Sequence, residues 1–223
     1  MRAILPHHCL LCGVTAFHRP LCAACEVDLP HYSTAACPVC ALPAPGGQVC
    51  GICLRRPPAF DRTLAAFSYG FPVDRLLHAF KYGGNLALVD ALAQPLARLV
   101  AVQPRPDLLL PMPLHPSRLK ERGFNQSLEI AKPISSWLDI PLEACACRRT
   151  RDTPTQAGLK LRERRRNVRG AFACDLDLSG KSVAVLDDVM TTGATLEEIS
   201  RVLRRSGATT ISAWVVARTA KEA

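Results

Sequence analysis

The sequence contains no run of about 18 uncharged apolar residues, the length that a membrane-spanning helix needs. Its start, Met-Arg-Ala-Ile-Leu-Pro-His-His-Cys, lacks the apolar core of a secretory signal peptide. These absences argue against a membrane-spanning or exported chain, so we expect a cytoplasmic protein. Aromatic residues are also scarce, at 5% of the chain. If the protein binds nucleic acid, this scarcity favours phosphate contacts over base stacking.

Acidic residues are too few to balance the basic ones, and the formal net charge is +9. Such an excess indicates an anionic partner, which includes nucleotide phosphates, pyrophosphate and nucleic acid. Basic residues concentrate in two places, from Arg118 to Arg122 and from Arg148 to Arg169. A charge run is often only a solvated face, and this alternative stays open for both stretches.

Eight of the eleven cysteines follow one pattern, Cys-x2-Cys-x9-Cys-x2-Cys, which occurs twice. The cysteines are, in order, Cys9, Cys12, Cys22, Cys25, Cys37, Cys40, Cys50 and Cys53. A Cys-x2-Cys turn presents two thiolates to one tetrahedral Zn²⁺, and two such turns complete its shell. We therefore predict two structural Cys₄ zinc sites, with redox-active thiol pairs as the alternative.

The pattern leaves open which cysteine pairs share an ion. Equal internal spacing favours sequential pairing, a double zinc ribbon, over an interleaved arrangement. Large apolar residues are too few between the cysteines to form a core, so the metal supplies most of the folding free energy. A closed Cys₄ shell has no open coordination position, so we expect a structural clip or contact surface. The Arg-Arg-Pro-Pro segment that starts at Arg55 places the boundary of this module, giving residues 1–56 and a second domain, 57–223.

The second domain alternates between apolar strands and amphipathic helices. Strands are expected at 63–69, 107–111, 182–186 and 210–216, and helices at 75–81, 89–99, 128–138 and 196–205. Asn85 is a candidate cap for the second helix. Pro95 predicts a kink in that helix or an earlier end, and Pro133 is expected to interrupt the helix at 128–138. The span 148–170 has few apolar residues and is expected to be a loop. This alternation predicts an α/β fold with a parallel sheet flanked by helices.

The segment Val183–Thr195 carries the most informative pattern for function. A buried strand leads into Asp187 and Asp188, and a loop of threonines and one glycine then precedes a helix. The first N–H groups of a helix favour an anion, hydroxyls add donors, and Gly193 lets the backbone approach a phosphate closely. Two carboxylates can accept hydrogen bonds from sugar hydroxyls or hold a divalent cation. No Lys follows the glycine, so this is not a Walker loop; the alternative is an ordinary turn with solvent-facing aspartates.

This run resembles the phosphoribosyl-pyrophosphate (PRPP) motif of type I phosphoribosyltransferases. The resemblance implies that Asp187 and Asp188 contact the ribose 2′- and 3′-hydroxyls, with Mg²⁺ bridging ribose and diphosphate oxygens. The loop that would cradle the 5′-phosphate consists of Thr191, Thr192, Gly193, Ala194 and Thr195. Candidate cations for the diphosphate or for nucleic acid are Lys81, Arg118, Lys120, Arg122, Arg162, Arg164 and Arg165. We expect the last three on a mobile loop that closes over the site.

Two further segments, 111–126 and 153–172, extend the resemblance. The first segment reads Pro-Met-Pro-Leu-His-Pro-Ser-Arg-Leu-Lys-Glu-Arg-Gly-Phe-Asn-Gln. The second segment begins with Thr-Pro-Thr-Gln-Ala-Gly-Leu and ends with Arg-Gly-Ala-Phe. Together with the cysteine module they resemble the ComF family, bacterial competence-associated proteins that join a zinc ribbon to a phosphoribosyltransferase-like domain. The resemblance spans essentially the whole chain. It implies a role in DNA uptake and natural transformation, in handling single-stranded DNA at the cytoplasmic side.

Three functions stay open at this point. The first is an active, Mg²⁺-dependent phosphoribosyltransferase that displaces pyrophosphate from PRPP with an unknown acceptor. The second is a single-stranded-DNA-binding protein that retains PRPP binding. The third is an adaptor whose zinc ribbon docks on a DNA-import or helicase protein. We favour the second, because basic stretches with few aromatics suit phosphate-backbone binding.

Overall fold

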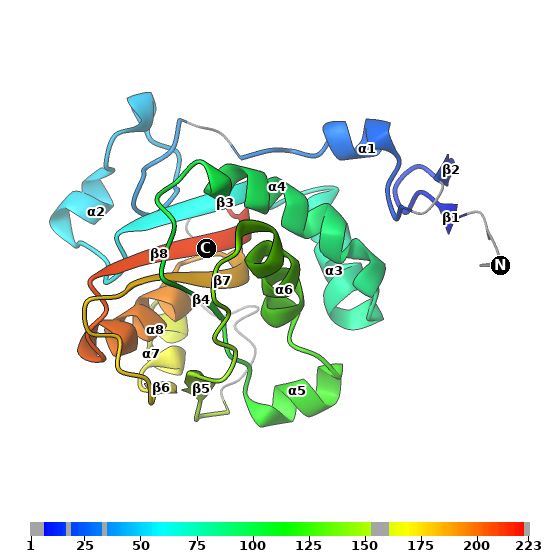
Figure 1. Cartoon of the computed structure of the whole chain (residues 1–223). Helices are drawn as coiled ribbons and strands as arrows, with labels where there is room; N and C mark the ends of the chain where they lie inside the picture. Colours follow the sequence, from blue (N-terminus) through cyan, green and yellow to red (C-terminus); the bar gives the residue numbers. More distant parts are fainter. Residues whose placement is uncertain (1–6, 17–18, 33–34, 153–160, 221–223) are drawn as a thin grey trace.

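The computed structural model describes residues 7–16, 19–32, 35–152 and 161–220. Within them, a sheet of four parallel strands organises the carboxyl-terminal part of the chain (Figure 1). The strand order is β3 (Arg62–Ser68), β8 (Thr210–Arg218), β7 (Ser182–Met190) and β4 (Leu108–Pro111). The predicted parallel sheet flanked by helices is confirmed.

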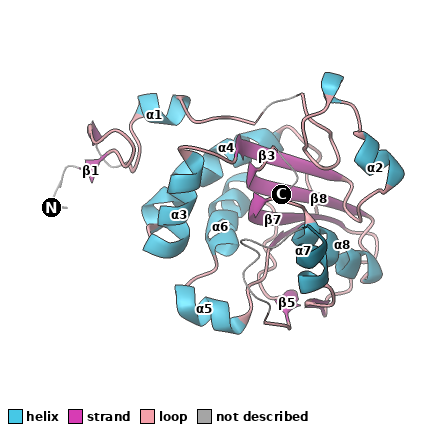
Figure 2. Ribbon diagram, turned by 180° about the vertical axis from the view of Figure 1, so that it is seen from behind, coloured by secondary structure: helices cyan, strands magenta, loops and turns pink. Residues whose placement is uncertain are grey.

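Helices cover both faces of this sheet, as the opposite views in Figures 1 and 2 show. On one face lie α3 (Val73–Gly83), α4 (Val89–Ala101) and α6 (Gln126–Leu138), whose buried apolar side chains form one core cluster with the sheet. On the other face α8 (Ala194–Arg205) packs against β7 and β8 in a second cluster. Because both faces are covered, the central strands are continuous apolar runs rather than alternating ones.

The remaining described elements are short. They are β1 (His7–His8), β2 (Thr15–Ala16), α1 (Ala23–Val27), η1 (Pro45–Gly47), α2 (Gly51–Arg55), η2 (Leu86–Leu88), α5 (Pro116–Arg122), β5 (Cys147–Arg149), α7 (Leu161–Val168) and β6 (Phe172–Cys174). β1 pairs with β2, and β5 with β6, both antiparallel. Among the helices in the described ranges, none has the length and hydropathy needed to cross a membrane. The division after residue 56 stays a prediction.

Two expectations about the secondary structure were wrong, one about the end of a strand and one about a loop. β7 does not end at Leu186 but continues through both acids to Met190, because its pairing with β8 continues as far as Arg218. The span 148–170 is not one loop, since it contains the end of β5 and the helix α7. Leu, Arg and Glu are good helix formers even without an apolar stripe, and Val168 anchors the end of α7 in the core. Residues 153–160 of the second motif lie outside the described residues.

The prolines expected to interrupt helices do not end them. Pro95 lies inside α4 and Pro133 inside α6, and each helix is one element. The free energy gained by burying the neighbouring apolar side chains offsets the hydrogen bond that each proline removes. The expected cap at Asn85 makes no side-chain hydrogen bond, whereas Asn125 caps α6 by accepting the N–H groups of Ser127 and Leu128.

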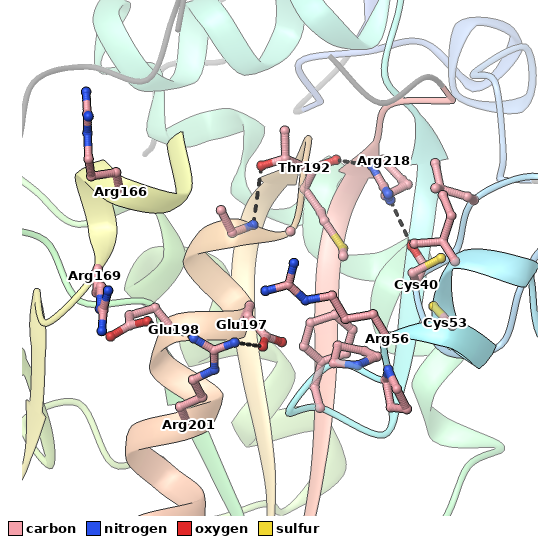
Figure 3. A pocket seen from close by; sticks show the side chains of 18 residues that line it. Cys40, Cys53, Arg56, Arg166, Arg169, Thr192, Glu197, Glu198, Arg201 and Arg218 are labelled. Carbon is pink, nitrogen blue, oxygen red and sulfur yellow. Dashed lines mark hydrogen bonds and ion pairs between the residues drawn. The ribbon is translucent and has the colours of Figure 1, made fainter. Parts of the chain in front are cut away.

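Arg218, the last residue of β8, joins the cysteine-rich module to the sheet. The side chain is buried, and its Nε donates to the carbonyl oxygen of Cys40 at 3.0 Å (Figure 3). Its Nη1 donates to the carbonyl oxygens of Met190, at 3.1 Å, and of Thr191. A buried guanidinium needs partners for its N–H groups. Arg218 therefore fixes the second cysteine cluster against the loop that follows β7.

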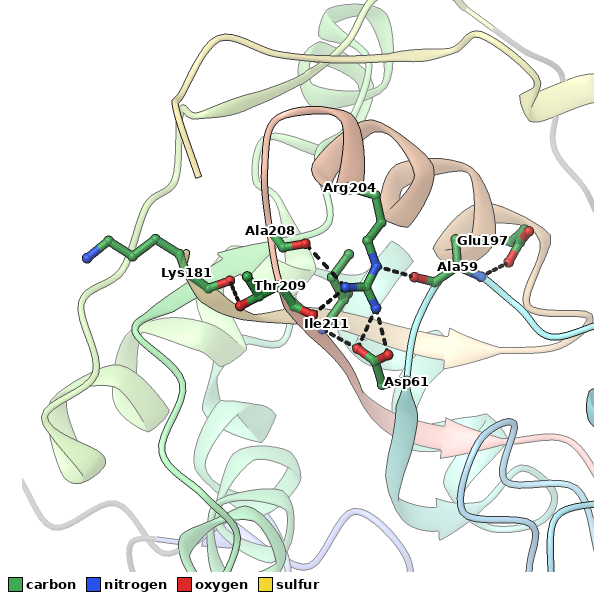
Figure 4. Close-up of polar contacts among 8 residues, drawn as sticks. All are labelled: Ala59, Asp61, Lys181, Glu197, Arg204, Ala208, Thr209 and Ile211. Carbon is green, nitrogen blue, oxygen red and sulfur yellow. Dashed lines mark hydrogen bonds and ion pairs between the residues drawn. The ribbon is translucent and has the colours of Figure 1, made fainter. Parts of the chain in front are cut away.

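Arg204, in the last turn of α8, ties this helix to the starts of β3 and β8 (Figure 4). Its guanidinium donates to both carboxylate oxygens of Asp61, at 2.6 and 2.7 Å, and to the carbonyl oxygens of Ala59 and Thr209. Asp61 in turn accepts the backbone N–H of Ile211 at 2.6 Å. Both contacts to the carboxylate come from one nitrogen, Nη2 of Arg204, and a hydrogen bond between two charged groups is roughly twice as strong as a neutral one.

Replacing Arg204 by methionine should lower the free energy of unfolding by about 2 kcal/mol, because Asp61 and the carbonyl groups lose their donor. Urea denaturation measures this difference. Arg205→Met is the matched control, since Arg205 is exposed in the same turn, and it should change the free energy by less than about 0.5 kcal/mol. Equal effects of the two substitutions would contradict a structural role for the Arg204 network.

Candidate functional site

The two acids of the predicted motif lie at the carboxyl end of β7, where α3 and α6 approach it. Asp188 is 5% exposed, and its Oδ2 lies 2.7 Å from Nζ of Lys81 on α3. Asp187 accepts hydrogen bonds from Oγ of Ser127 on α6, at 3.4 Å, and from the backbone N–H of Asp188, at 2.9 Å. Two helices from one face of the sheet therefore hold the acid pair in place.

The charges of this cluster shift one another's protonation. Burial and the neighbouring Asp188 carboxylate raise the pKa of Asp187 to about 7, against the opposite influence of Lys81 and of the hydrogen bonds from the Asp188 N–H and Ser127. Burial alone would lower the pKa of Lys81, but the attraction of Asp188 and Asp187 outweighs it and the pKa is raised. Near neutral pH, Asp187 therefore gains and loses its proton while Lys81 keeps its charge.

The loop after the acids ends at Gly193, the N-cap residue of α8. Its φ of 75° is left-handed, and a Cβ atom there would lie 2.7 Å from Cε of Met190, so another residue would be strained. Oγ1 of Thr192 accepts the backbone N–H of Ala194 at 3.3 Å. The first N–H groups of a helix have no partners within it, so the start of α8 offers donors to an anion. Acids and loop thus meet at one end of β7.

The predicted cations are distributed over three helices. Lys81, on α3, pairs with Asp188. Arg118, Lys120 and Arg122 lie on α5, and the Arg122 guanidinium lies 5.2 Å from the ring centre of Tyr82, the neighbour of Lys81. The last three candidates belong to the helix α7 rather than to the expected mobile loop, and the structure does not describe their side chains; they are Arg162, Arg164 and Arg165.

Two residues at the site were missed from the sequence, Ser127 and Arg149. Ser127 directly follows the motif that ends at Gln126, and this position next to the motif is the sequence feature that indicates its role. Arg149 lies on β5 inside the span expected to be a loop. Its pKa is lowered, because burial and the charge of Arg118 outweigh the opposite influence of Asp187 and Asp152. Arg149 is therefore within electrostatic reach of the acid pair.

The eight patterned cysteines form two separate groups of four. Cys9, Cys12, Cys22 and Cys25 make the first group, and Cys37, Cys40, Cys50 and Cys53 the second; within each, the sulfur atoms lie within 4.8 Å of one another. Four thiolates converging at this separation suit a tetrahedral Zn²⁺. Both predicted Cys₄ zinc sites are confirmed, with sequential pairing rather than an interleaved arrangement.

Each cluster should bind one zinc ion independently. Replacing Cys40 by serine should lower the zinc content from about two ions to about one per chain, because a hard hydroxyl is a poor substitute for a thiolate. Inductively coupled plasma mass spectrometry of the purified protein measures the number of zinc ions per chain. Cys145→Ser is the control, because Cys145 is exposed and lies outside both clusters. An unchanged zinc content in Cys40→Ser would contradict the assignment.

Comparison with known proteins identifies two family models along the chain. Residues 1–54 match the model of the double zinc ribbon domain, and residues 125–223 match that of the phosphoribosyl transferase domain. Among solved structures, a glutamine PRPP amidotransferase from B. subtilis matches 59% of this chain and 26% of its own, with 25% identity and a TM-score of 0.41. A purine phosphoribosyltransferase from Pyrococcus horikoshii Ot3 matches 71% and 89%, with 22% identity and a TM-score of 0.35.

Curated relatives match along almost the full length. The DNA utilization protein YhgH of Escherichia coli O157:H7 is 36% identical, over 96% of this chain and 98% of the relative. Competence protein F of Haemophilus influenzae is 33% identical, over 89% of this chain and 85% of the relative. Competence protein ComFC of Bacillus subtilis is 25% identical, over 89% of this chain and 84% of the relative. The chain therefore belongs to the ComF family of competence and DNA utilization proteins, with a double zinc ribbon and a phosphoribosyltransferase domain.

Proposed function

We propose that this protein binds PRPP together with Mg²⁺ at the acid pair and the loop 191–195. One observation carries the proposal: Asp187 and Asp188 lie near the carboxyl end of the buried parallel strand β7, which ends at Met190 directly before the loop that leads into α8. In parallel α/β sheets, ligands bind beyond the carboxyl ends of the strands. Carboxylates suit ribose hydroxyls and magnesium, and N–H groups with threonine hydroxyls suit a phosphate.

Lys81 has two successive partners in this scheme. In the free protein its ammonium group neutralises Asp188 and limits the repulsion between the acids. Asp187 and Asp188 would hold Mg²⁺, which would supply positive charge to the phosphorylated sugar. Lys81 then releases Asp188, and its ammonium group contacts the diphosphate. Arg149 is a second cation whose charge interacts with that of Asp187.

Replacing both acids, Asp187→Asn/Asp188→Asn, should weaken the binding of PRPP in the presence of Mg²⁺ by about a hundredfold or more, because amides do not carry the charge that holds the cation. Isothermal titration calorimetry measures the dissociation constant. Asp90→Asn serves as the control, since Asp90 is an exposed acid at the start of α4. Undiminished PRPP binding in the double variant would exclude the acid pair as the ligand site.

PRPP binding should also weaken as the pH falls below 7. With the pKa of Asp187 raised to about 7, its ionised fraction falls roughly tenfold between pH 8 and pH 6, so the dissociation constant should rise about tenfold. Calorimetry at several pH values tests this. The Asp187→Asn variant provides the comparison, because its profile should contain only the titration of the ligand. Identical profiles for both proteins would place the titrating group elsewhere.

We further propose that the protein binds single-stranded DNA through its basic surface, in a role in DNA uptake at the cytoplasmic side. The net charge of +9 and the basic helices α5 and α7 support this proposal. The names of the relatives, competence and DNA utilization proteins, point to the same substrate. The double zinc ribbon, whose metal sites are closed, offers a contact surface for a DNA-import or helicase protein.

The triple charge reversal Arg162→Glu/Arg164→Glu/Arg165→Glu should weaken single-stranded-DNA binding at least about tenfold and reduce the slope of log K against log salt by about 2. Fluorescence anisotropy of a labelled oligonucleotide at several ionic strengths measures both quantities. Arg98→Glu/Lys132→Glu/Arg205→Glu makes the same change in net charge on exposed residues of α4, α6 and α8. If this control loses as much affinity, binding depends on net charge and not on α7.

An active phosphoribosyltransferase is the second candidate function. The position of Lys81 favours it, because an ammonium group 2.7 Å from Asp188 is well placed to meet the charge that builds on a leaving diphosphate. The reaction would displace pyrophosphate from C1′ of PRPP with an unknown acceptor. Release of pyrophosphate in the presence of an acceptor distinguishes this function from binding alone.

A further inference from the structure

A cavity of about 470 Å³ lies between the second cysteine cluster, the start of α8 and the end of α7 (Figure 3). It is separate from the acid pair, because neither acid lines it. The cavity lies on the side of the loop toward which a Cβ atom on Gly193 would point. Such an atom would face Met190 and Phe60, which both line the cavity. Those two residues belong to the core cluster on the α8 face, whereas α3 and α6, which hold the acids, pack on the opposite face.

One wall of this cavity is apolar and is built mainly by the zinc module and the segment after it. Leu42, Ile52, Pro57, Pro58 and Phe60 line it. Ile52 is 40% exposed, so its apolar surface is not consumed by packing against the protein. Pockets of about 300–1,000 Å³ with apolar walls and a few polar groups are the usual size and character of small-molecule sites. The wall suits a planar, apolar ring system.

The opposite wall carries charge that the protein has already neutralised in part. Glu197 accepts the backbone N–H of Ala59, at 2.8 Å, and a guanidinium N–H of Arg201, at 2.6 Å. Glu198 accepts the backbone N–H of Gly170 at 2.7 Å and lies 3.7 Å from Arg201. Hydrogen bonds from neutral N–H groups leave the charge of a carboxylate in place, so Glu197 and Glu198 with Arg201 leave this wall with one net negative charge.

Three further arginines of the lining, Arg56, Arg166 and Arg169, outnumber that negative charge and make the lining net positive. All three are exposed, and their guanidinium groups make no hydrogen bond or ion pair to any residue that the structure describes. Figure 3 shows Arg56 reaching across the cavity toward α8. Guanidinium groups are the preferred protein partners of phosphate groups. The cavity thus combines an apolar wall with unpaired phosphate-binding groups.

We propose that this cavity binds a nucleoside monophosphate, with the base against the apolar wall and the phosphate at Arg56. The volume suits a single nucleotide rather than a run of them. The proposal does not depend on PRPP binding, because neither acid lines the cavity, and only the loop residues Thr192–Ala194 belong both to its lining and to the proposed PRPP site. A nucleotide here would contact the zinc module and the loop residues Thr192–Ala194 at the same time.

Titration calorimetry with AMP tests this proposal in the Asp187→Asn/Asp188→Asn protein, where the proposed PRPP site is disabled. We expect one AMP per chain, a loss of affinity of at least about tenfold in Arg56→Ala, and no change in Arg55→Ala. Arg55 is the matched control, because it is exposed next to Arg56 and does not line the cavity. Adenosine and inorganic phosphate alone should each bind at least about tenfold more weakly than AMP. The zinc content of Arg56→Ala should remain unchanged.

Three results would overturn the proposal. The first is no AMP binding to either the wild-type protein or the acid double variant. The second is binding that Arg56→Ala leaves unchanged. The third is AMP binding that the acid double variant abolishes, which would assign the nucleotide to the PRPP site. Binding of an oligonucleotide that depends on Arg56, without binding of AMP, would assign the cavity to nucleic acid and likewise overturn the proposal.

Discussion

Two adjacent carboxylates at the buried end of a core strand are the constraint on which the rest of the site depends. Such a pair is costly to bury, because each charge loses its hydration and repels the other. The fold offsets this cost with the ammonium group of Lys81, 2.7 Å from Asp188, and with hydrogen bonds to Asp187 from Ser127 and from the backbone. Even so, the pKa of Asp187 stays raised to about 7. Because the fold does not fully offset the repulsion between the two buried carboxylates, the site is suited to a ligand that brings a cation.

The zinc ribbon is joined to the loop that follows β7 rather than being a separate appendage. Arg218 donates both to the carbonyl of Cys40, in the second cysteine cluster, and to the carbonyls of Met190 and Thr191, at the start of the loop 191–195. Loss of the second zinc ion would release Cys40 and remove one of the supports of that loop. The second cysteine cluster therefore supports its own module and, through Arg218, the loop that follows β7.

The sequence predicts the sheet, most helices and the cysteine clusters because these features depend on local spacing. The apolar runs of β7 and β8 and the two Cys-x2-Cys repeats need no tertiary information. The partners of the acids are different, since Ser127 and Arg149 reach Asp187 only through folding. The same holds for Arg218, because only folding brings its partners Cys40 and Met190 to it. Tertiary contacts also decide the continuity of helices that contain proline.

A crystal structure of the protein with PRPP and Mg²⁺ tests the proposed ligand site most directly. The proposal predicts the 5′-phosphate on the N–H groups of the loop 191–195, the ribose hydroxyls on Asp187 and Asp188, and Lys81 detached from Asp188. A ligand located elsewhere, with Lys81 still paired to Asp188, would contradict it.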